Sequence, residues 1–186
     1  MSSISRKDGP GFSFAVGLVF IIWLVSSLDL LGLWAGHVPL LLPRTISGLA
    51  GIPFVPFLHG DIPHLLSNTI PLFVFSLLVS LKGRVYFLKV TLSIIFLSGV
   101  LIWLMGRPAY HIGASTLIFG YFGFLLARVF YDRKPVTAIV SIVVAIVYGG
   151  LIWGVLPQGN HISWEGHLFG LIAGTIVAKS TTHTRA

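Results

Sequence analysis

Four polar side chains lie in apolar stretches of the chain, where unpaired polar groups are rare. Ser115 belongs to GASTLIFG at 113–120, His167 to GHLFGLIAG at 166–174, and His64 and Asn68 to HGDIPHLLSN at 59–68. A hydroxyl, imidazole or amide buried in hydrocarbon costs free energy unless it is paired. A serine and a histidine set among further hydrogen-bond donors predict nucleophilic hydrolysis.

Ser115 and His167 have the chemistry of a nucleophile and its base. Ser115 follows Gly113 at the expected start of a helix, where free backbone N–H groups and the positive dipole end favour a developing oxyanion. The serine hydroxyl needs a general base, and His167 is the candidate. Glu165 lies two residues from His167 on a different face of the helix, so it is not placed to orient the ring. We therefore predict a Ser-His dyad.

Two neighbouring side chains are expected to act as oxyanion donors, and one aromatic ring is expected to support the base. His64 and Asn68 are four residues apart, hence on one helix face, and both can donate to the oxygen of a tetrahedral intermediate. Phe119 lies one turn after Ser115 and is placed to stack on the imidazole of His167.

Composition places the chain among polytopic membrane proteins. Of its 186 residues 55% are hydrophobic and 9% are charged, and the mean hydropathy is +0.96. There is no cysteine, which excludes a thiolate nucleophile. The net charge of +7 comes from short basic clusters between apolar runs, so it indicates membrane topology and not nucleic-acid binding.

The apolar runs predict an all-α, six-helix membrane protein. The expected spans are 14–36, 64–81, 85–105, 113–131, 135–156 and 164–180. They form one membrane domain at 14–180, between cytoplasmic tails at 1–13 and 181–186, and leave a long outer loop at 37–62. With simple alternation nearly all basic residues fall on one side, which predicts an N-in, C-in topology. The chain is expected in the cell (inner) membrane, with its site on the extracytoplasmic side.

The predicted site residues share a side and a depth. A rise of about 1.5 Å per residue, counted back from Lys82, Arg128 and Lys179, places Asn68, Ser115 and His167 roughly 20 Å above the inner boundary. Hydrolysis at that depth requires a polar cavity open to the outside.

A ridge of small residues is expected to bring two of these helices together. Gly166, Gly170 and Gly174 recur every four residues, which allows another helix backbone to come close. If that neighbour is the helix that carries Gly113, Gly120 and Gly123, Ser115 and His167 can meet at hydrogen-bond distance. The histidines at 37, 111, 161 and 183 fall in loops or the tail and are expected to be solvated or interfacial.

These motifs together resemble the rhomboid family of intramembrane serine proteases, over essentially the whole six-helix core. HGDIPHLLSN is similar to the family's H-x4-H-x3-N signature, GAST to its G-x-S-G motif, and GHLFGLIAG to its small-H-x2-G-x3-G segment. Two features differ from the pattern: Thr116 replaces the last glycine of G-x-S-G, and the first outer loop lacks the usual Trp-Arg pair.

The resemblance implies a nucleophile at Ser115, a general base at His167, and an oxyanion hole made by His64, Asn68 and main-chain N–H groups near Ser115, which include that of Ala114. It gives His59 a structural role. It implies cleavage of single-pass or polytopic membrane proteins near the top of a transmembrane segment, without metal or nucleotide, and points to the fifth helix and the outer loop as the gate. Oligomeric state is left open.

Three alternatives remain at this stage. Thr116 motivates a proteolytically inactive rhomboid-like protein that binds transmembrane clients. Intramembrane polar residues also suit a small transporter or channel, although no repeat supports one. His59, His64 and His167 are possible zinc ligands, but neither a carboxylate nor a cysteine completes the set.

Overall fold

The computed structural model describes residues 11–34, 37–157 and 163–182, and within these ranges it contains helices and no strand. The all-α prediction is confirmed. The six long helices are α1 (Phe12–Leu30), α3 (Ile62–Ser80), α4 (Arg84–Met105), α5 (Ser115–Asp132), α6 (Pro135–Tyr148) and α7 (Trp164–Thr182). The shorter elements are α2 (Ile46–Gly51) and the 3-10 helices η1 (Ile52–Phe57) and η2 (Gly149–Val155). The predicted division into two tails and one domain stays a prediction.

Four helical segments are long and apolar enough to cross a membrane by length and composition: α1, α3, α4 and α6 continued by η2. This supports an integral, multi-pass membrane protein. α5 and α7 lie outside that set; α5 carries Arg128 and Asp132, and α7 carries Glu165 and Lys179. Six crossings and an N-in, C-in orientation therefore stay predictions.

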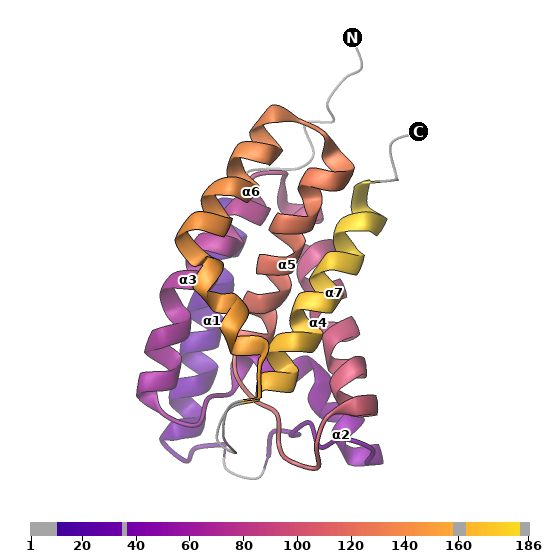
Figure 1. Ribbon diagram of the computed structural model, residues 1–186. Helices are drawn as coiled ribbons and strands as arrows, with labels where there is room; N and C mark the ends of the chain where they lie inside the picture. The colour runs from indigo at the N-terminus through magenta and orange to yellow at the C-terminus, as the bar shows by residue number, and fades with distance from the viewer. Residues whose placement is uncertain (1–10, 35–36, 158–162, 183–186) are drawn as a thin grey trace.

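Consecutive long helices run in alternating directions. Lys82, just after α3, bonds through Nζ to Asp132 Oδ2 at the end of α5 at 3.1 Å, and Arg84 at the start of α4 lies over the Phe14 ring of α1. The starts of α1 and α4 and the ends of α3 and α5 thus share one end of the molecule, which we call the Asp132 end. Figure 1 places the start of α6 and the end of α7 there as well.

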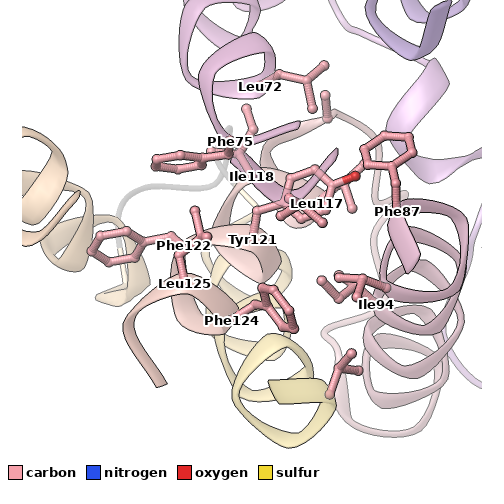
Figure 2. Packing of buried hydrophobic residues seen from close by; sticks show 14 of the residues in the cluster. Leu72, Phe75, Phe87, Ile94, Leu117, Ile118, Tyr121, Phe122, Phe124 and Leu125 are labelled. Carbon is pink, nitrogen blue, oxygen red and sulfur yellow. The ribbon is translucent and has the colours of Figure 1, made fainter. Parts of the chain in front are cut away.

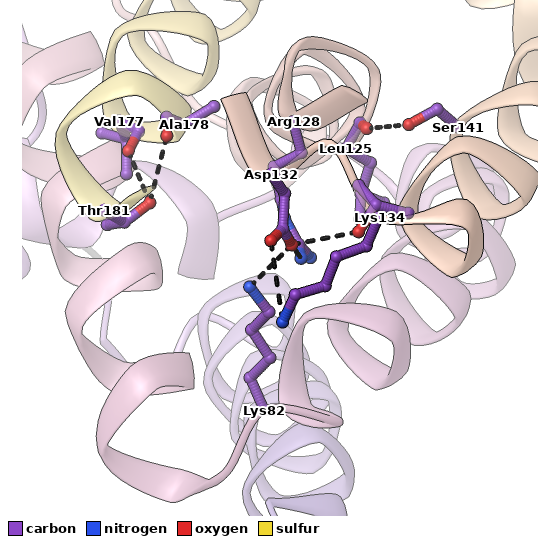
Figure 3. A network of polar contacts seen from close by, with 10 residues as sticks. Lys82, Leu125, Arg128, Asp132, Lys134, Ser141, Val177, Ala178 and Thr181 are labelled. Carbon is purple, nitrogen blue, oxygen red and sulfur yellow. Dashed lines mark hydrogen bonds and ion pairs between the residues drawn. The ribbon is translucent and has the colours of Figure 1, made fainter. Parts of the chain in front are cut away.

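The Asp132 end is held by a network around one carboxylate (Figure 3). Asp132 accepts from Arg128 one turn earlier, from Lys82 and from Thr137 Oγ1 at 3.0 Å, and Lys134 Nζ lies 3.9 Å from its other oxygen. Because Thr137 belongs to α6, one side chain joins α3, α5 and α6 at this end.

The connection expected at 37–62 contains two short helices that the sequence analysis does not predict. α1 ends at Leu30 instead of 36, and α2 and η1 follow within the connection. Thr45 caps α2 by accepting the Gly48 N–H at 3.0 Å, and Pro53 lies in the first turn of η1, where its missing N–H costs nothing. Leu41 and Ile52 from this connection are buried.

α5 forms the centre of the bundle (Figure 1). Every residue from 115 to 125 is buried. Figure 2 shows Leu72 and Phe75 of α3 and Phe87 and Ile94 of α4 around the α5 core residues, which include Leu117, Tyr121, Phe122 and Phe124.

The glycine ridge of α7 packs on α5, as the sequence predicts. A Cβ at Gly174 would overlap the carbonyl oxygen of Gly120, and a Cβ at Gly170 would overlap that of Thr116. The two backbones are therefore too close for any side chain at these positions, which fixes α7 at the depth where its histidine meets α5.

The loop histidines differ from one another in burial. His37 is exposed, as expected, whereas His111 is only 1% exposed, so the expectation of a solvated or interfacial ring was wrong there. The ring can be buried because both of its nitrogens have partners, Ser163 Oγ at 2.6 Å and the Arg107 carbonyl oxygen at 3.3 Å. The His111 N–H bonds the Leu41 carbonyl at 3.1 Å, which holds the loop before α5 against the connection after α1. His161 and His183 lie outside the described residues.

Candidate active site

A cavity of about 760 Å³ opens at the end of the bundle opposite Asp132. Its walls come from the start of α3, the loop before α5, the start of α5, η2 and the start of α7. Five residues that the sequence analysis selected line it: His64, Asn68, Ser115, Phe119 and His167. Exposed residues at its rim, Asp61 and Tyr110 among them, show that it reaches the molecular surface. The fold therefore contains a cavity that opens at the molecular surface and has polar side chains in its lining.

Ser115 is the first residue of α5 and is 8% exposed. Gly113, two residues earlier, has φ +120°, a conformation that L side chains rarely adopt, and a Cβ there would press on the His64 ring at 2.9 Å. The glycine thus lets the chain turn sharply into α5 while His64 approaches. The N–H groups of the first turn have no partner inside the helix, so the positive end of α5 lies at the serine.

His167 is held on two sides. Its ring lies parallel to Phe119 with centroids 4.2 Å apart, and its Nδ1 lies 2.8 Å from the Gly154 carbonyl oxygen of η2. A carbonyl oxygen only accepts, so Nδ1 carries the proton and Nε2 keeps the lone pair of the neutral ring. The predicted stacking is confirmed. Both Ser115 and His167 line the cavity. The hydrogen bond expected between them is not among the contacts of the described residues.

His64 and Asn68 lie one turn apart on α3, and both face the cavity. Asn68 is 7% exposed, and its Nδ2 has no hydrogen-bond partner among the described residues. A buried donor without a partner costs free energy. Asn68 and Ser115 line the same cavity, so this donor is available to a molecule bound there.

His59 lies behind the site in a chain of hydrogen bonds. Its Nε2 accepts the Ala114 N–H at 3.2 Å, its Nδ1–H donates to Ser26 Oγ at 2.8 Å, and that hydroxyl donates to the Phe57 carbonyl at 2.8 Å. Burial, with a smaller effect of the neighbouring His64 charge, lowers the pKa of His59 to about 4. The ring is neutral at pH 7, as this bonding requires.

The His59 contact bears on two sequence-based expectations. The Ala114 N–H is already used by His59, so its expected part in the oxyanion hole does not fit this arrangement. Both His59 ring nitrogens are engaged, which leaves no lone pair for a metal. Within the described ranges no three His, Cys, Asp or Glu side chains are grouped as metal ligands.

Neither Thr116 nor Glu165 is among the residues that line the cavity. Thr116 is buried against α7, where its Oγ1 would lie 2.7 Å from a Cβ at Gly166, and it does not line the cavity. Glu165 pairs with Arg107 of the loop before α5, Oε1 to Nε at 3.5 Å. The expectation that Glu165 does not orient His167 agrees with this pairing.

Sequence reasoning missed the partners that hold the imidazoles. Gly154 contributes a main-chain carbonyl, a group that every residue type carries. Ser26 lies beside Ser27 near the end of α1, and neither spacing nor charge links it to His59. Gly170, selected as a supporting residue, acts through packing on the Thr116 backbone, outside the cavity lining.

Comparison with known proteins agrees with this architecture. The Rhomboid domain family matches residues 47–183. An uncharacterized protein of Mycobacterium tuberculosis is 39% identical over 169 residues, covering 86% of this chain and 70% of its own length. One from Mycobacterium leprae is 40% identical over 139 residues, covering 70% and 55% respectively. The Bacillus subtilis protein named "Putative rhomboid protease YdcA" is 27% identical over 182 residues, covering 91% and 87%.

The matched region includes α3, α5 and α7 and therefore every residue that lines the cavity. The chain belongs to the rhomboid family of membrane proteins.

Proposed function

We propose that the protein is an intramembrane serine endopeptidase that hydrolyses peptide bonds in or near transmembrane segments of other membrane proteins. The observation that carries this proposal is the placement of Ser115, His167, His64 and Asn68 around one cavity, with the His167 tautomer set by Gly154. These are the nucleophile, the base and the oxyanion donors that acyl transfer requires.

In the proposed reaction, Ser115 Oγ attacks the scissile carbonyl carbon and His167 Nε2 takes the hydroxyl proton. The carbonyl π electrons move to oxygen, and the resulting oxyanion accepts from the Ser115 N–H, Asn68 Nδ2 and a ring N–H of His64. The intermediate collapses with cleavage of the C–N bond, and the amine leaves with the proton from His167. Water then attacks the acyl-enzyme with His167 again as base, which releases the acid and restores the serine.

A dyad requires that another group hold the imidazole and stabilise its charged form. The Gly154 carbonyl holds the imidazole through its hydrogen bond to Nδ1. The negative end of this carbonyl dipole faces the positive charge that appears on the ring when Nε2 is protonated. The Phe119 face fixes the ring plane. In enzymes without bound substrate, the nucleophile and its base often lie farther apart than in the substrate complex. The absence of a Ser115–His167 hydrogen bond among the described residues is therefore compatible with this proposal.

The distribution of charge supports an extracytoplasmic site. Lys82, Arg84, Arg128 and Lys134 lie at the Asp132 end, whereas the described contacts place Arg44 and Arg107 at the cavity end. Cytoplasmic loops carry the excess of Lys and Arg, so the Asp132 end is assigned to the cytoplasm and the cavity to the outer side of the cell membrane. Its substrates are membrane proteins that reach the cavity from the bilayer.

The alternative of an inactive, client-binding protein rests on Thr116. That side chain occupies the α5–α7 contact opposite Gly166 and leaves the cavity open, so its presence has a packing explanation that does not require loss of activity.

Cleavage of a single-span model substrate by the purified protein tests the proposal. We expect products with intact protein and none with Ser115→Ala, while a chelator changes nothing. Binding of the substrate without cleavage under the same conditions would favour the client-binding alternative.

A further inference from the structure

The loop before Ser115 contains a buried histidine that has no role in the proposed reaction. His111 lies four residues before Ser115 and is 1% exposed. It does not line the cavity, and none of its ring contacts involves Ser115 or His167. Burying an imidazole costs free energy, so its contacts need an explanation.

The two ring nitrogens of His111 have distinct partners. Nε2 lies 3.3 Å from the Arg107 carbonyl oxygen, and Nδ1 lies 2.6 Å from Ser163 Oγ. The carbonyl can only accept, so Nε2 carries the proton. Nδ1 is then the acceptor, and the Ser163 hydroxyl donates to it. Burial lowers the pKa of His111, and Arg107 and Glu165 are the charged groups that face it, so the ring is neutral at pH 7 in this arrangement.

Ser163 connects this ring to the base. It immediately precedes α7, and its carbonyl oxygen accepts the His167 N–H at 3.3 Å. One serine thus binds His111 through its hydroxyl and the first turn of the His167 helix through its carbonyl. The route from His111 to the backbone of His167 consists of two hydrogen bonds through a single residue.

A second contact runs parallel to this one. Arg107 Nε of the same loop pairs with Glu165 Oε1 in the first turn of α7 at 3.5 Å. The same loop is also bonded to the connection after α1. The His111 N–H donates to the Leu41 carbonyl, and the Gly113 N–H donates to the Val55 carbonyl at 2.8 Å. The loop that precedes Ser115 is therefore bonded directly to the helix that contains His167.

We propose that His111 is a positioning residue that sets the distance between Ser115 and His167 through Ser163. This inference rests on the proposed function. The glycine contacts between α5 and α7 fix the two helices along their length, but Ser115 and His167 both lie at the helix starts, where fraying is greatest. A misplacement of 1 Å at a nucleophile and its base is enough to cost on the order of 10²-fold in rate.

Two substitutions of His111 test the two hydrogen bonds of its ring separately. In His111→Asn the amide oxygen takes the place of Nδ1 and can accept from Ser163, whereas in His111→Gln the amide nitrogen takes the place of Nε2 and can donate only to Arg107. Ser163→Ala removes the hydroxyl and leaves His111 intact. His37→Gln, at an exposed histidine of the outer connection, is the matched control.

Steady-state cleavage of the single-span substrate is measured for each variant, together with thermal unfolding in detergent. We expect Ser163→Ala and His111→Gln to lower kcat about tenfold with KM changed by less than about twofold, since geometry and not binding is lost. His111→Asn should recover most of the rate, and combining it with Ser163→Ala should return the rate to that of Ser163→Ala alone. His37→Gln should match the wild type.

Wild-type kcat in both Ser163→Ala and His111→Gln would overturn the inference and leave the proposed function standing. It is equally overturned if the loss of kcat follows the loss of folded protein and His111→Asn is no better than His111→Gln. A wild-type protein that cleaves nothing would overturn the proposed function together with this inference.

Discussion

The Nδ1 atom of His167 lies 2.8 Å from the carbonyl oxygen of Gly154. In the proposed Ser-His pair, this contact supplies the orienting group that a carboxylate supplies in a triad. It also explains the glycine, because a Cβ at position 154 would lie 2.7 Å from Phe119 Cζ and 3.3 Å from His167 Nδ1. The base is therefore held by main chain and by an aromatic face, both in a cavity wall.

Gly154→Ala should displace the imidazole. The added methyl group pushes Phe119 and His167 out of their parallel arrangement, so we expect kcat to fall by on the order of 10- to 100-fold, with a smaller change in KM. Gly149→Ala in the same 3-10 helix is the control, because nothing lies within 4 Å of its Cβ. Equal rates for the two variants would show that Gly154 does not position the base.

Asn68→Leu should separate activity from stability. The substitution removes a donor that has no partner among the described residues, so the melting temperature in detergent should stay constant or rise. Loss of an oxyanion donor should nevertheless lower kcat by about 10²- to 10³-fold. A variant that melts earlier and still cleaves at the wild-type rate would place Asn68 in the structure and outside the reaction.

Stability should depend on pH through His59. Its pKa falls from 6.5 to about 4 on folding, so the folded state disfavours the protonated ring. The stabilising effect of the neutral ring is complete above pH 6.5 and is lost as pH falls toward 4, because the unfolded chain then binds a proton that the folded chain does not. The total change is about 3 kcal/mol.

Thermal unfolding in detergent between pH 4 and 8 measures this dependence. His59→Asn should flatten the profile in that window, whereas His37→Asn, at an exposed ring, should leave it unchanged. A wild-type profile that is flat between pH 4 and 6.5 would contradict a neutral, buried His59.

The sequence was informative wherever helical spacing decides the outcome. Four-residue spacing put His64 beside Asn68, placed Phe119 to meet His167, and brought Gly170 and Gly174 onto α5, and the structure contains each of these contacts. Counting residues from the charged helix ends predicted a similar depth for Ser115 and His167, and in the structure both line one cavity.

Contacts made by main chain or between distant loops were not predictable in this way. The Gly154 carbonyl has no residue-specific signal, and the buried ring of His111 depends on Ser163, 52 positions away. The proline-rich connection after α1 was expected as a loop partly sunk in the interface, and the two short helices in it were not predicted. A helix tolerates proline in its first turn, which is where Pro53 lies in η1.

Covalent labelling of the purified protein with a fluorophosphonate, followed by peptide mass spectrometry, tests whether His167 activates Ser115 as a nucleophile. The proposed Ser-His mechanism predicts one adduct on Ser115, abolished in Ser115→Ala and strongly reduced in His167→Ala, because the hydroxyl is nucleophilic only with its base. A folded wild-type protein that takes up no probe, or labelling of Ser115 that is equally fast without the His167 imidazole, would contradict it.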